Sequence, residues 1–521
     1  MRRCTLITLT LLATLLTLTA ALFAVACHAL APQPGEWSHT LRIGPRGWQF
    51  ERPVSVPALL RVATHPLGLA LLDGRSTDTP LGRWTWQRVA PDRLAGRCAP
   101  CRLPFDALGP QPLLLPHAEL QLQRVAQERY RGTLTLGDGE QAVVLKGRAQ
   151  LTSTGLVIDA ELADTALADV YAAFGPAAIP ELQRARIDGR VAAKLNLRLP
   201  ERRLVVQPRI DGFEVSGLGT EALLDAEPAM ACAAGTPRPV AGEAGTRVIG
   251  WLPRAVVAAE DQRFAEHAGY DLPQLLAAWS ANQKQPPSAS GGARPQGAST
   301  LTQQLAKLVY TGDERSAVRK LRELLYAVEM ERTLGKGRIL QLYLAIAPWG
   351  EGVCGAEAAA RHYLRKSSAR LTPLEAAWLA SLLRAAPAPG ALVAVDTERV
   401  GWVLTSLRGP LPAERRAEQM EVLRSGWTPP VRRCATPGEG VSCRRAAKLA
   451  PPAPAPLSAP PPTAAVPRRR ACPARCRAIA AAPRTRRPPP RRRAVVAPAA
   501  GSCSAAARAS SAPAAAARCS G

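Results

Sequence analysis

The residue types best suited to catalysis lie together in residues 260–271, which combine adjacent carboxylates, an aromatic ring, a histidine and a glycine. A carboxylate at the end of a helix, such as Glu260, can face both solvent and substrate. Taken alone, Glu260 has a second interpretation as a solvated acid ending a helix that begins near Pro253, and His267 as a structural hydrogen-bonding residue.

A second block, residues 297–307, predicts the start of a helix that faces an anion. Thr300 and Gln303 have capping-box spacing, and the small residues before them let backbone N–H groups approach an anionic group. Lys307 lies about two turns into this helix, where its ammonium group can reach phosphate oxygens. An ordinary capped helix is the alternative.

A third block predicts a helix that starts at residues 311–314, again with capping-box spacing. Arg315, Arg319 and Glu323 recur every four residues on one face. The two guanidinium groups favour the ionised form of Glu323, which suits an electrostatic or orienting role. A surface ladder of salt bridges has the same spacing. The core-facing stripe comprises Val318, Leu321, Leu325 and Val328.

The N-terminus predicts a membrane helix. Arg2 and Arg3 precede an uncharged stretch whose apolar centre, residues 6–26, is long enough to cross a hydrocarbon layer of about 30 Å. We expect a single-pass signal anchor in residues 1–31, with the rest of the chain on the outer side of the membrane. Cleavage after residues 29–31, or at Cys27 as in a lipoprotein, are the processed alternatives.

Residues 37–227 are predicted to be β-rich. Apolar and polar residues alternate in residues 156–162 and 194–199, as in half-buried strands, and the Asp-Gly pairs at 138–139 and 188–189 predict turns. Arg-Ile-Asp-Gly occurs at 186–189 and again at 209–212, which indicates a repeated β-meander. Residues 37–128 show no clear pattern. An antiparallel sheet that only spaces or docks another domain is one interpretation of this region.

Cysteines and composition bound the remaining possibilities. Cys98 and Cys101 are expected to form a local disulfide that closes a turn. A redox or metal site is the alternative, and no further ligands complete such a site.

The net charge of the chain is +26, but the Pro/Ala/Arg-rich stretch from Arg432 onward holds 18 Lys or Arg residues and one acid. This concentration argues against a nucleic-acid-binding domain.

Proline-rich, aromatic-poor sequence buries too little apolar surface to fold. We therefore expect a disordered basic tail in residues 429–521, which either binds anionic lipid or polymer or is not native coding sequence. Residues 228–246, rich in Ala, Gly and Pro, predict a linker, and residues 247–410 predict consecutive amphipathic helices. The predicted fold class is multidomain α+β.

In this order, the three blocks resemble the family 51 glycosyltransferases, the peptidoglycan polymerases. The first block fits Glu-Asp-x-x-Phe-x-x-His-x-Gly. The second fits Gly-Gly-Ser-Thr-Ile-Thr-Gln-Gln-x-x-Lys with Ala298 and Leu301 as replacements, and the third fits Arg-Lys-x-x-Glu at Arg319, Lys320 and Glu323. Residues 336–344, 355–363 and 371–387 continue the pattern. Residues 37–227 resemble, weakly, the periplasmic modules of AsmA-like proteins.

The resemblance implies a mainly α-helical, lysozyme-like domain with a membrane-embedded jaw that polymerises lipid II with inversion at the anomeric carbon. It implies that Glu260 is the general base and that Glu323 is the second acid of the catalytic pair. Undecaprenyl diphosphate is the leaving group. The implied substrate-binding residues are Asp261, Phe264, His267, Ser299, Thr300, Gln303, Gln304, Lys307, Arg315, Arg319 and Lys320.

The implied partners are lipid II, the growing glycan chain, lipids of the bacterial cytoplasmic membrane and other cell-wall synthesis proteins, but no nucleic acid. No residue is implied as a metal ligand, although the resemblance admits a divalent cation, Mg²⁺ or Mn²⁺, at the diphosphate. The catalytic domain is expected on the periplasmic side. Neither Ser-x-x-Lys nor Lys-Thr-Gly follows Arg408, so we expect no transpeptidase activity.

Further departures from the family pattern follow: Leu308 and Ala345 replace its usual Asn, and Leu364 and Arg365 replace the Phe and Gly of its usual Tyr-Phe-Gly-Lys. Two alternatives remain open at this point. A lysozyme-like lytic enzyme would need a protonated acid at the scissile bond. A non-catalytic envelope scaffold or lipid-handling protein would carry a vestigial glycosyltransferase domain.

Overall fold

The computed structural model describes residues 2–43, 50–103, 111–225, 230–233, 236–239, 249–284, 297–314, 316–350, 352–384 and 394–429. These residues all belong to one compact unit, Met1–Val441. The predicted tail, beyond Pro429, lies outside the described residues, as does Arg315. Within the predicted linker, strands β14 (Met230–Ala233) and β15 (Thr236–Pro239) form a two-stranded ribbon.

The predicted N-terminal helix is present as α1 (Arg2–Ala29). Among the described residues it is the one helix long and apolar enough to cross a membrane, over Thr10–Ala29, and none of that stretch is buried inside the protein. A signal sequence would have the same character. After it, β1 (Ser38–Ile43) and β2 (Phe50–Ser55) pair antiparallel, and two short helices follow, α2 (Val56–Ala63) and α3 (Pro66–Leu72).

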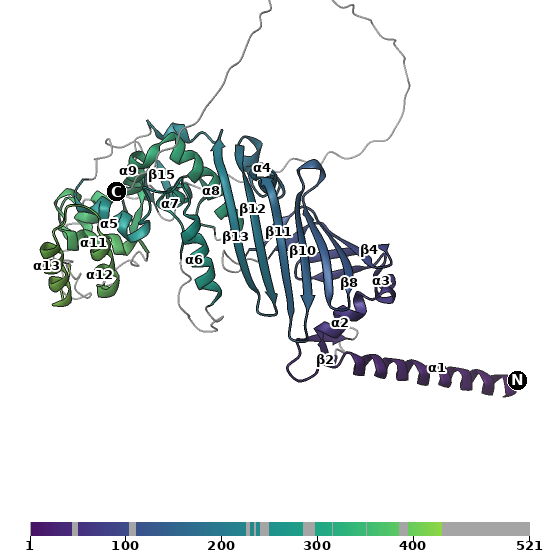
Figure 1. Cartoon of the computed structure of the whole chain (residues 1–521). Coiled ribbons are helices and arrows are strands. Elements are labelled where there is room, and N and C mark those ends of the chain that lie inside the picture. Colours follow the sequence, from purple (N-terminus) through teal and green to yellow (C-terminus); the bar gives the residue numbers. More distant parts are fainter. Residues whose placement is uncertain are drawn as a thin grey trace, which may run out of the picture. The chain divides into compact units, whose positions relative to one another are not determined.

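A nine-stranded antiparallel sheet forms most of the β-rich region (Figure 1). Its order is β13-β12-β11-β10-β9-β8-β5-β4-β3, so almost every strand pairs with its neighbours in sequence. The strands are β3 (Ser76–Thr79), β4 (Gly82–Ala90), β5 (Arg93–Cys98), β8 (Ala118–Ala126), β9 (Arg129–Leu136), β10 (Val143–Leu151), β11 (Leu156–Ala166), β12 (Arg186–Leu199) and β13 (Arg203–Ser216). Several of them lie in residues 37–128, where the sequence showed no clear pattern.

A short hairpin of β6 (Cys101–Leu103) and β7 (Leu113–Leu115) interrupts the meander between β5 and β8. The predicted disulfide is confirmed here: Cys98 and Cys101 are bonded, with their Cα atoms 5.5 Å apart. The disulfide joins the end of β5 to the start of β6. With both sulfurs in the disulfide, neither is available as a thiolate ligand for a metal.

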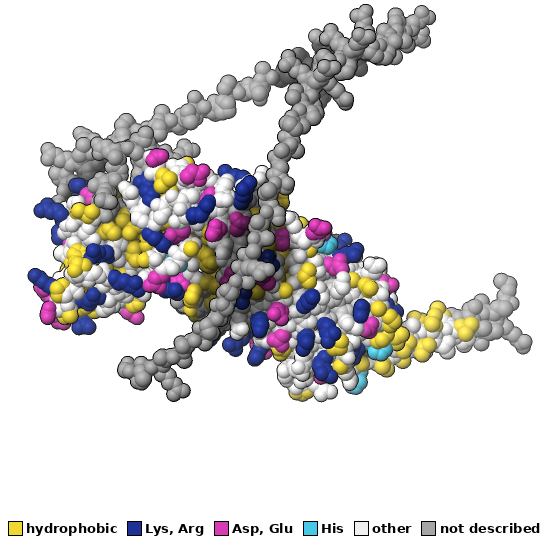
Figure 2. Space-filling view, turned by 45° about the horizontal axis from the view of Figure 1, so that its top comes forward, with side chains coloured by type: hydrophobic (Ala, Val, Ile, Leu, Met, Phe, Trp, Pro, Cys, Tyr) yellow, Lys and Arg dark blue, Asp and Glu magenta, His cyan; other side chains and the backbone are white. Residues whose placement is uncertain are grey.

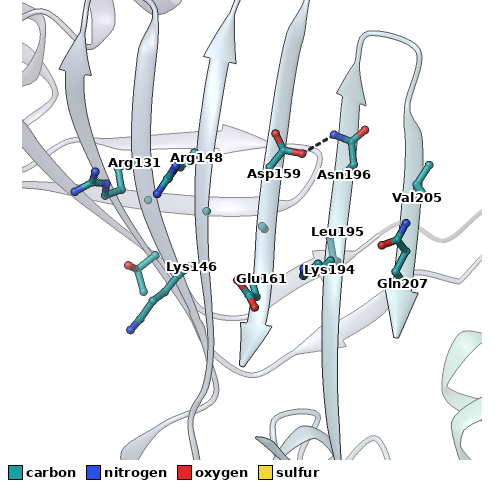
Figure 3. A pocket seen from close by; sticks show the side chains of 14 residues that line it. Arg131, Lys146, Arg148, Asp159, Glu161, Lys194, Leu195, Asn196, Val205 and Gln207 are labelled. Atoms are coloured by element: carbon teal, nitrogen blue, oxygen red, sulfur yellow. Dashed lines mark hydrogen bonds between the residues drawn. The ribbon is translucent and has the colours of Figure 1, made fainter. Parts of the chain in front are cut away.

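The alternating segments form strands as predicted. Leu162 of β11 lies opposite Leu145 and Ala193 on the neighbouring strands, so the apolar side chains share one face. The other face is polar and carries a depression of about 680 Å³ across β9 to β13 (Figure 3). There Asn196 donates a 2.7 Å hydrogen bond to Asp159. None of the predicted site residues lines this depression.

The turn predicted at residues 188–189 is wrong. Gly189 lies inside β12, at a bulge where the register with β13 shifts. Its φ is +100°, and a Cβ there would lie 2.5 Å from the carbonyl oxygen of Gly212, so only glycine fits. The two Arg-Ile-Asp-Gly segments thus lie beside each other on adjacent strands and mark a bulge.

Residues 249–429 form the predicted helical domain. Its core gathers large side chains from distant helices, including Leu252, Leu325, Trp378 and Val400, all fully buried. The main helices are α5 (Trp251–Glu260), α6 (Leu272–Gln283), α7 (Leu301–Ala306), α8 (Ala317–Thr333), α9 (Gly335–Ile346), α11 (Pro373–Ser381), α12 (Thr397–Ser406) and α13 (Ala413–Arg424). Short elements connect them: the π turns Lys307–Thr311 and Ala360–Leu364, strands β16 (Pro348–Gly350) and β17 (Val353–Cys354), and α10 (Ala356–Ala359).

The start predicted for the third-block helix is wrong. Thr311 ends a π-helical turn, and Gly312 then has φ +76°, which interrupts the helix. Helix α8 begins at Ala317, and the side chain of Ser316 caps it by accepting a hydrogen bond from the backbone N–H of Arg319 at 3.1 Å. The capping-box spacing at 311–314 is coincidental.

Helix α8 packs on the segments at the edge of the sheet. Glu181, which is 4% exposed, accepts hydrogen bonds from Arg322 Nε at 2.9 Å and Nη2 at 2.8 Å. Arg184 Nη2 donates to the Tyr326 hydroxyl at 3.0 Å, and the Leu218 N–H donates to Glu329 at 2.9 Å. Because α8 also carries Arg319, Lys320 and Glu323, these contacts fix the helix that bears the third block.

We predict that Glu181→Ala lowers the free energy of unfolding by about 2 kcal/mol, because it leaves the guanidinium of Arg322 without its bidentate partner. Urea denaturation measures this change. Asp78→Ala, which removes an exposed ion pair with Arg83, is the control and should leave the denaturation midpoint unchanged. Equal midpoints for all three proteins would contradict a stabilising interface.

Candidate active site

Glu260 is the last residue of α5, and its side chain is 13% exposed. Its Oε2 accepts a 3.1 Å hydrogen bond from Gln304 Nε2, and Gln304 Oε1 in turn accepts one from the Tyr343 hydroxyl at 2.8 Å. Arg399 Nη2 lies 3.6 Å from Oε1. Burial raises the pKa of Glu260, while the Gln304 hydrogen bond and the charge of Arg399 partly offset that rise.

One oxygen of this carboxylate is free to bind substrate. Oε1 of Glu260 is buried and has no hydrogen-bond partner among the described residues. A buried carboxylate oxygen normally accepts a hydrogen bond, so this atom is suited to accept one from a ligand hydroxyl. With its raised pKa, Glu260 has the position and the proton affinity of a general base.

The second acid has a different environment. Glu323 is fully buried, and its two oxygens bind different cations: Arg319 through Nη1, and Lys320 through Nζ at 2.7 Å. Lys320 Nζ also donates to Ser299 Oγ at 2.6 Å, which brings the second and third blocks together. A surface salt-bridge ladder is therefore excluded for Arg319 and Glu323.

Positive charge is concentrated around Ser299. Burial, with the nearby charges of Arg319 and Lys307, lowers the pKa of Lys320 to about 8. Lys307 lies on the π turn after α7, and its Nζ is 2.5 Å from Asp313 Oδ1. Such a cluster of partly desolvated cations is suited to a phosphate-bearing ligand.

Other predicted residues join the first two blocks. Asp261, which is 1% exposed, accepts hydrogen bonds from the Leu301 N–H at 2.9 Å and from His267 Nε2 at 3.0 Å. Thr300 and Gln303 form the predicted capping box, and the Thr300 hydroxyl also donates to the Gly269 carbonyl at 2.7 Å. This bonding holds the end of α5 against the start of α7.

Phe264 is likewise buried, and Lys336 Nζ lies 4.5 Å from the centre of its ring. The ring of His267 binds Asp261 and accepts a hydrogen bond from the Gly269 N–H, which agrees with a structural role. The substrate contacts predicted for Asp261, Phe264, His267, Thr300 and Gln303 stay predictions.

Two residues of the site were missed from the sequence. Arg399 lies on α12, far from Glu260 in the chain, within an ordinary helical pattern that contains no signal for it. Tyr343 lies in residues 336–344, which extend the family pattern, so that segment contained the signal. Arg399 donates to the Ala259 carbonyl at 2.6 Å, which fixes its guanidinium beside the end of α5.

The departures from the family pattern lie outside these contacts. Arg365 has φ +57°, a left-handed conformation that glycine adopts without strain, which accounts for the family's usual Gly there. Leu308 and Ala345 are partly buried against the main core. All three residues affect packing or backbone strain near the site and leave Glu260, Lys320 and Glu323 with their partners.

Glu323 and Asp261 are not suited to ligate a protein-bound metal. Both oxygens of Glu323 bind cations, and those of Asp261 bind His267 and a backbone N–H. Within the described residues, no three His, Cys, Asp or Glu side chains are grouped as metal ligands. A divalent cation at this site would be held by the oxygens of a diphosphate substrate.

The comparisons with known proteins support the resemblance found in the motifs. Residues 246–407 match the family model described as Transglycosylase. The chain is 46% identical over 132 residues to the biosynthetic peptidoglycan transglycosylase of Nitrosomonas eutropha, covering 25% of this chain and 52% of that protein. It is 47% identical over 137 residues to the protein of that name from Bordetella pertussis, covering 26% and 56%.

The predicted resemblance to the monofunctional transglycosylases is therefore confirmed for residues 246–407, which are similar to transglycosylase domains. The chain spans about half the length of the curated relatives it matches. The matched family segment begins at residue 246, after the nine-stranded sheet.

We predict that Asp261→Ala lowers the free energy of unfolding by about 3 kcal/mol, because it strips His267 and the start of α7 of a buried acceptor. Thermal and urea denaturation measure the loss. Glu266→Ala, which removes an exposed acid from the same loop, is the matched control and should unfold like the wild type. If both variants unfold alike, Asp261 does not hold the two blocks together.

Proposed function

We propose that this protein is a peptidoglycan glycosyltransferase that polymerises lipid II into glycan strands. The observation that carries the proposal is the pairing of two acids in contrasting environments. Among the described residues, Glu260 keeps one buried oxygen without a hydrogen-bond partner, whereas Glu323 is neutralised inside a cationic cluster. The match of residues 246–407 to the transglycosylase family supports the same assignment.

In the proposed reaction, Glu260 removes the proton from the 4-hydroxyl of the acceptor sugar. The resulting oxygen nucleophile attacks the anomeric carbon of the lipid-linked chain, so a glycosidic C–O bond forms as the bond to the diphosphate breaks. The proton remains on Glu260, and undecaprenyl diphosphate leaves with its charge. A single displacement of this kind inverts the anomeric configuration.

The cations are proposed to stabilise the leaving diphosphate. Lys307, Arg315, Arg319 and Lys320 supply fixed positive charge where negative charge develops. Ser299 and Gln304 would line the donor cleft. Lys320 orients Ser299, and Glu260 and Tyr343 orient Gln304. A divalent cation, Mg²⁺ or Mn²⁺, would supply further charge neutralisation at the diphosphate.

The cellular setting belongs to the same proposal. With α1 as a single-pass anchor in the bacterial cytoplasmic membrane, the catalytic domain would face the periplasm and take lipid II and the growing glycan directly from the bilayer. Membrane lipids and other cell-wall synthesis proteins are the proposed partners. The vestigial-scaffold alternative is not favoured, because the catalytic acids and their partners are intact.

The decisive test is polymer formation from purified lipid II by the detergent-solubilised protein. Glu260→Gln should lower the rate by about 10²–10⁴-fold, because the amide cannot take the proton. The matched control, Glu266→Gln, changes an exposed acid nearby and should leave the rate unchanged. Wild-type rates from Glu260→Gln would refute the assignment of Glu260 as the base.

We predict that Arg399→Gln moves the acidic limb of the kcat/KM profile to higher pH by roughly one unit. The base works only when it is deprotonated, and the charge of Arg399 lowers the pKa of Glu260. Removing that charge raises this pKa, so activity appears only at higher pH. Arg399→Lys retains the charge and should keep the limb near its wild-type position; an unmoved limb in Arg399→Gln would contradict the coupling.

A further inference from the structure

The α2–α3 hairpin exposes a patch of large apolar side chains. Leu67 is 73% exposed and Leu71 64%, and the other members of the patch are Leu59, Val62, Val89 and Val125. The two helices of the hairpin pack closely despite this exposure. A Cβ on Gly68 would lie 2.0 Å from the Val62 carbonyl oxygen, so the backbones of α2 and α3 are in contact there. Leu69 anchors the hairpin with 2% exposure.

The patch gathers at one end of the nine-stranded sheet. Arg124 Nη1 donates to the Arg61 carbonyl at 3.2 Å, which places the end of β8, next to Val125, against α2. The Arg88 N–H donates to Asp73 Oδ1 at 2.8 Å, which places the end of β4, next to Val89, against the end of α3. The strand ends that carry Val89 and Val125 therefore lie beside the hairpin, and we call these six exposed side chains the apolar cap.

The apolar cap lies next to the end of the candidate membrane helix. Leu30 follows α1 directly, and its carbonyl accepts a 2.8 Å hydrogen bond from the Ser55 N–H. Ser55 is also the N-cap of α2, accepting from the Ala58 N–H at 3.0 Å. The start of α2 is thus hydrogen-bonded to the residue that follows α1.

Charge around the cap suits a lipid surface. Arginines lie on the elements that carry the cap and on those beside them, and Arg61 is paired with Glu128 at 2.7 Å. These elements carry more basic than acidic residues. The arginines are Arg61, Arg88, Arg93, Arg124 and Arg129, and the acids are Asp73, Asp92 and Glu128. Figure 2 shows hydrophobic side chains beside Lys and Arg side chains where the sheet region continues into α1. Apolar side chains flanked by cations are typical of segments that lie in the membrane interface.

We propose that the apolar cap rests in the outer surface of the same bilayer that α1 crosses, with Leu67 and Leu71 inserted among the lipids. The inference rests on the proposed membrane placement of α1. Such an insertion would fix one end of the sheet at the membrane surface. The catalytic domain packs on β13 and η3 (Pro180–Gln183), so the sheet would also fix the distance of this domain from the lipid. The occupant of the cap is lipid, not a second copy of the chain.

Photo-crosslinking of the full chain in nanodiscs of phosphatidylethanolamine and phosphatidylglycerol tests the proposal. The photoreactive residue p-benzoylphenylalanine replaces Leu67 or Leu71, and each is exposed enough for the exchange to leave the fold intact. The positive control carries it at Leu16 in α1, and the matched control at Leu114 of β7, which is 47% exposed beside the Cys98–Cys101 disulfide at the other end of β5.

We expect lipid adducts at positions 67 and 71 with yields near that at 16 and roughly tenfold above that at 114. Yields at 67 and 71 equal to that at 114, with adducts at 16, would overturn the cap while leaving the anchor and the catalytic proposal intact. Crosslinks between two protein chains at 67 or 71 would overturn it in favour of self-association. No adduct at 16 would remove the anchor and, with it, this inference; lipid II polymerisation by the wild type is measured separately.

Discussion

A carboxylate with no exposed surface needs cations or hydrogen-bond donors at its oxygens to stay charged inside a protein, because desolvation of an unpaired charge is costly. Glu323 is such a group, and it requires Arg319 and Lys320 to remain at its two oxygens. That requirement fixes three side chains on α8 and, through Lys320, the position of Ser299. The sheet region further fixes the position of α8, since Glu181 binds Arg322 on that helix. The cationic site is thus a consequence of one buried charge.

The two acids then divide the chemistry between them. Burial raises the pKa of Glu260, and one of its oxygens has no hydrogen-bond partner among the described residues, which suits it to accept a proton. Glu323 has both oxygens occupied, so it is a poor nucleophile and a poor proton donor. A raised pKa at Glu260 would equally suit the protonated acid that a lytic reaction needs at the bond to be cleaved. The cations at Lys320 and Arg319 are what favour direct displacement of a diphosphate over hydrolysis of a glycan.

Much of this site was predictable because its contacts are local. The capping box of Thr300 and Gln303 and the four-residue spacing of Arg319 and Glu323 are properties of single helices, and the alternation in β11 is a property of a single strand. Arg399 was not predictable, because tertiary packing alone brings α12 to Glu260. The start of α8 was misplaced because a π turn and Gly312 override the capping-box spacing at 311–314, and Gly189 was taken for a turn because a bulge uses the same residue types.

The central claim is that Glu260 acts as a base in a single displacement while Glu323 never bonds to the sugar. Turnover of lipid II can be quenched and examined in two ways: intact-protein mass spectrometry for a glycosyl adduct, and NMR of the polymer for the anomeric configuration of its linkages. The account predicts linkages inverted relative to the donor and a protein of unchanged mass. Retained configuration, or a sugar covalently attached to Glu323, would contradict it.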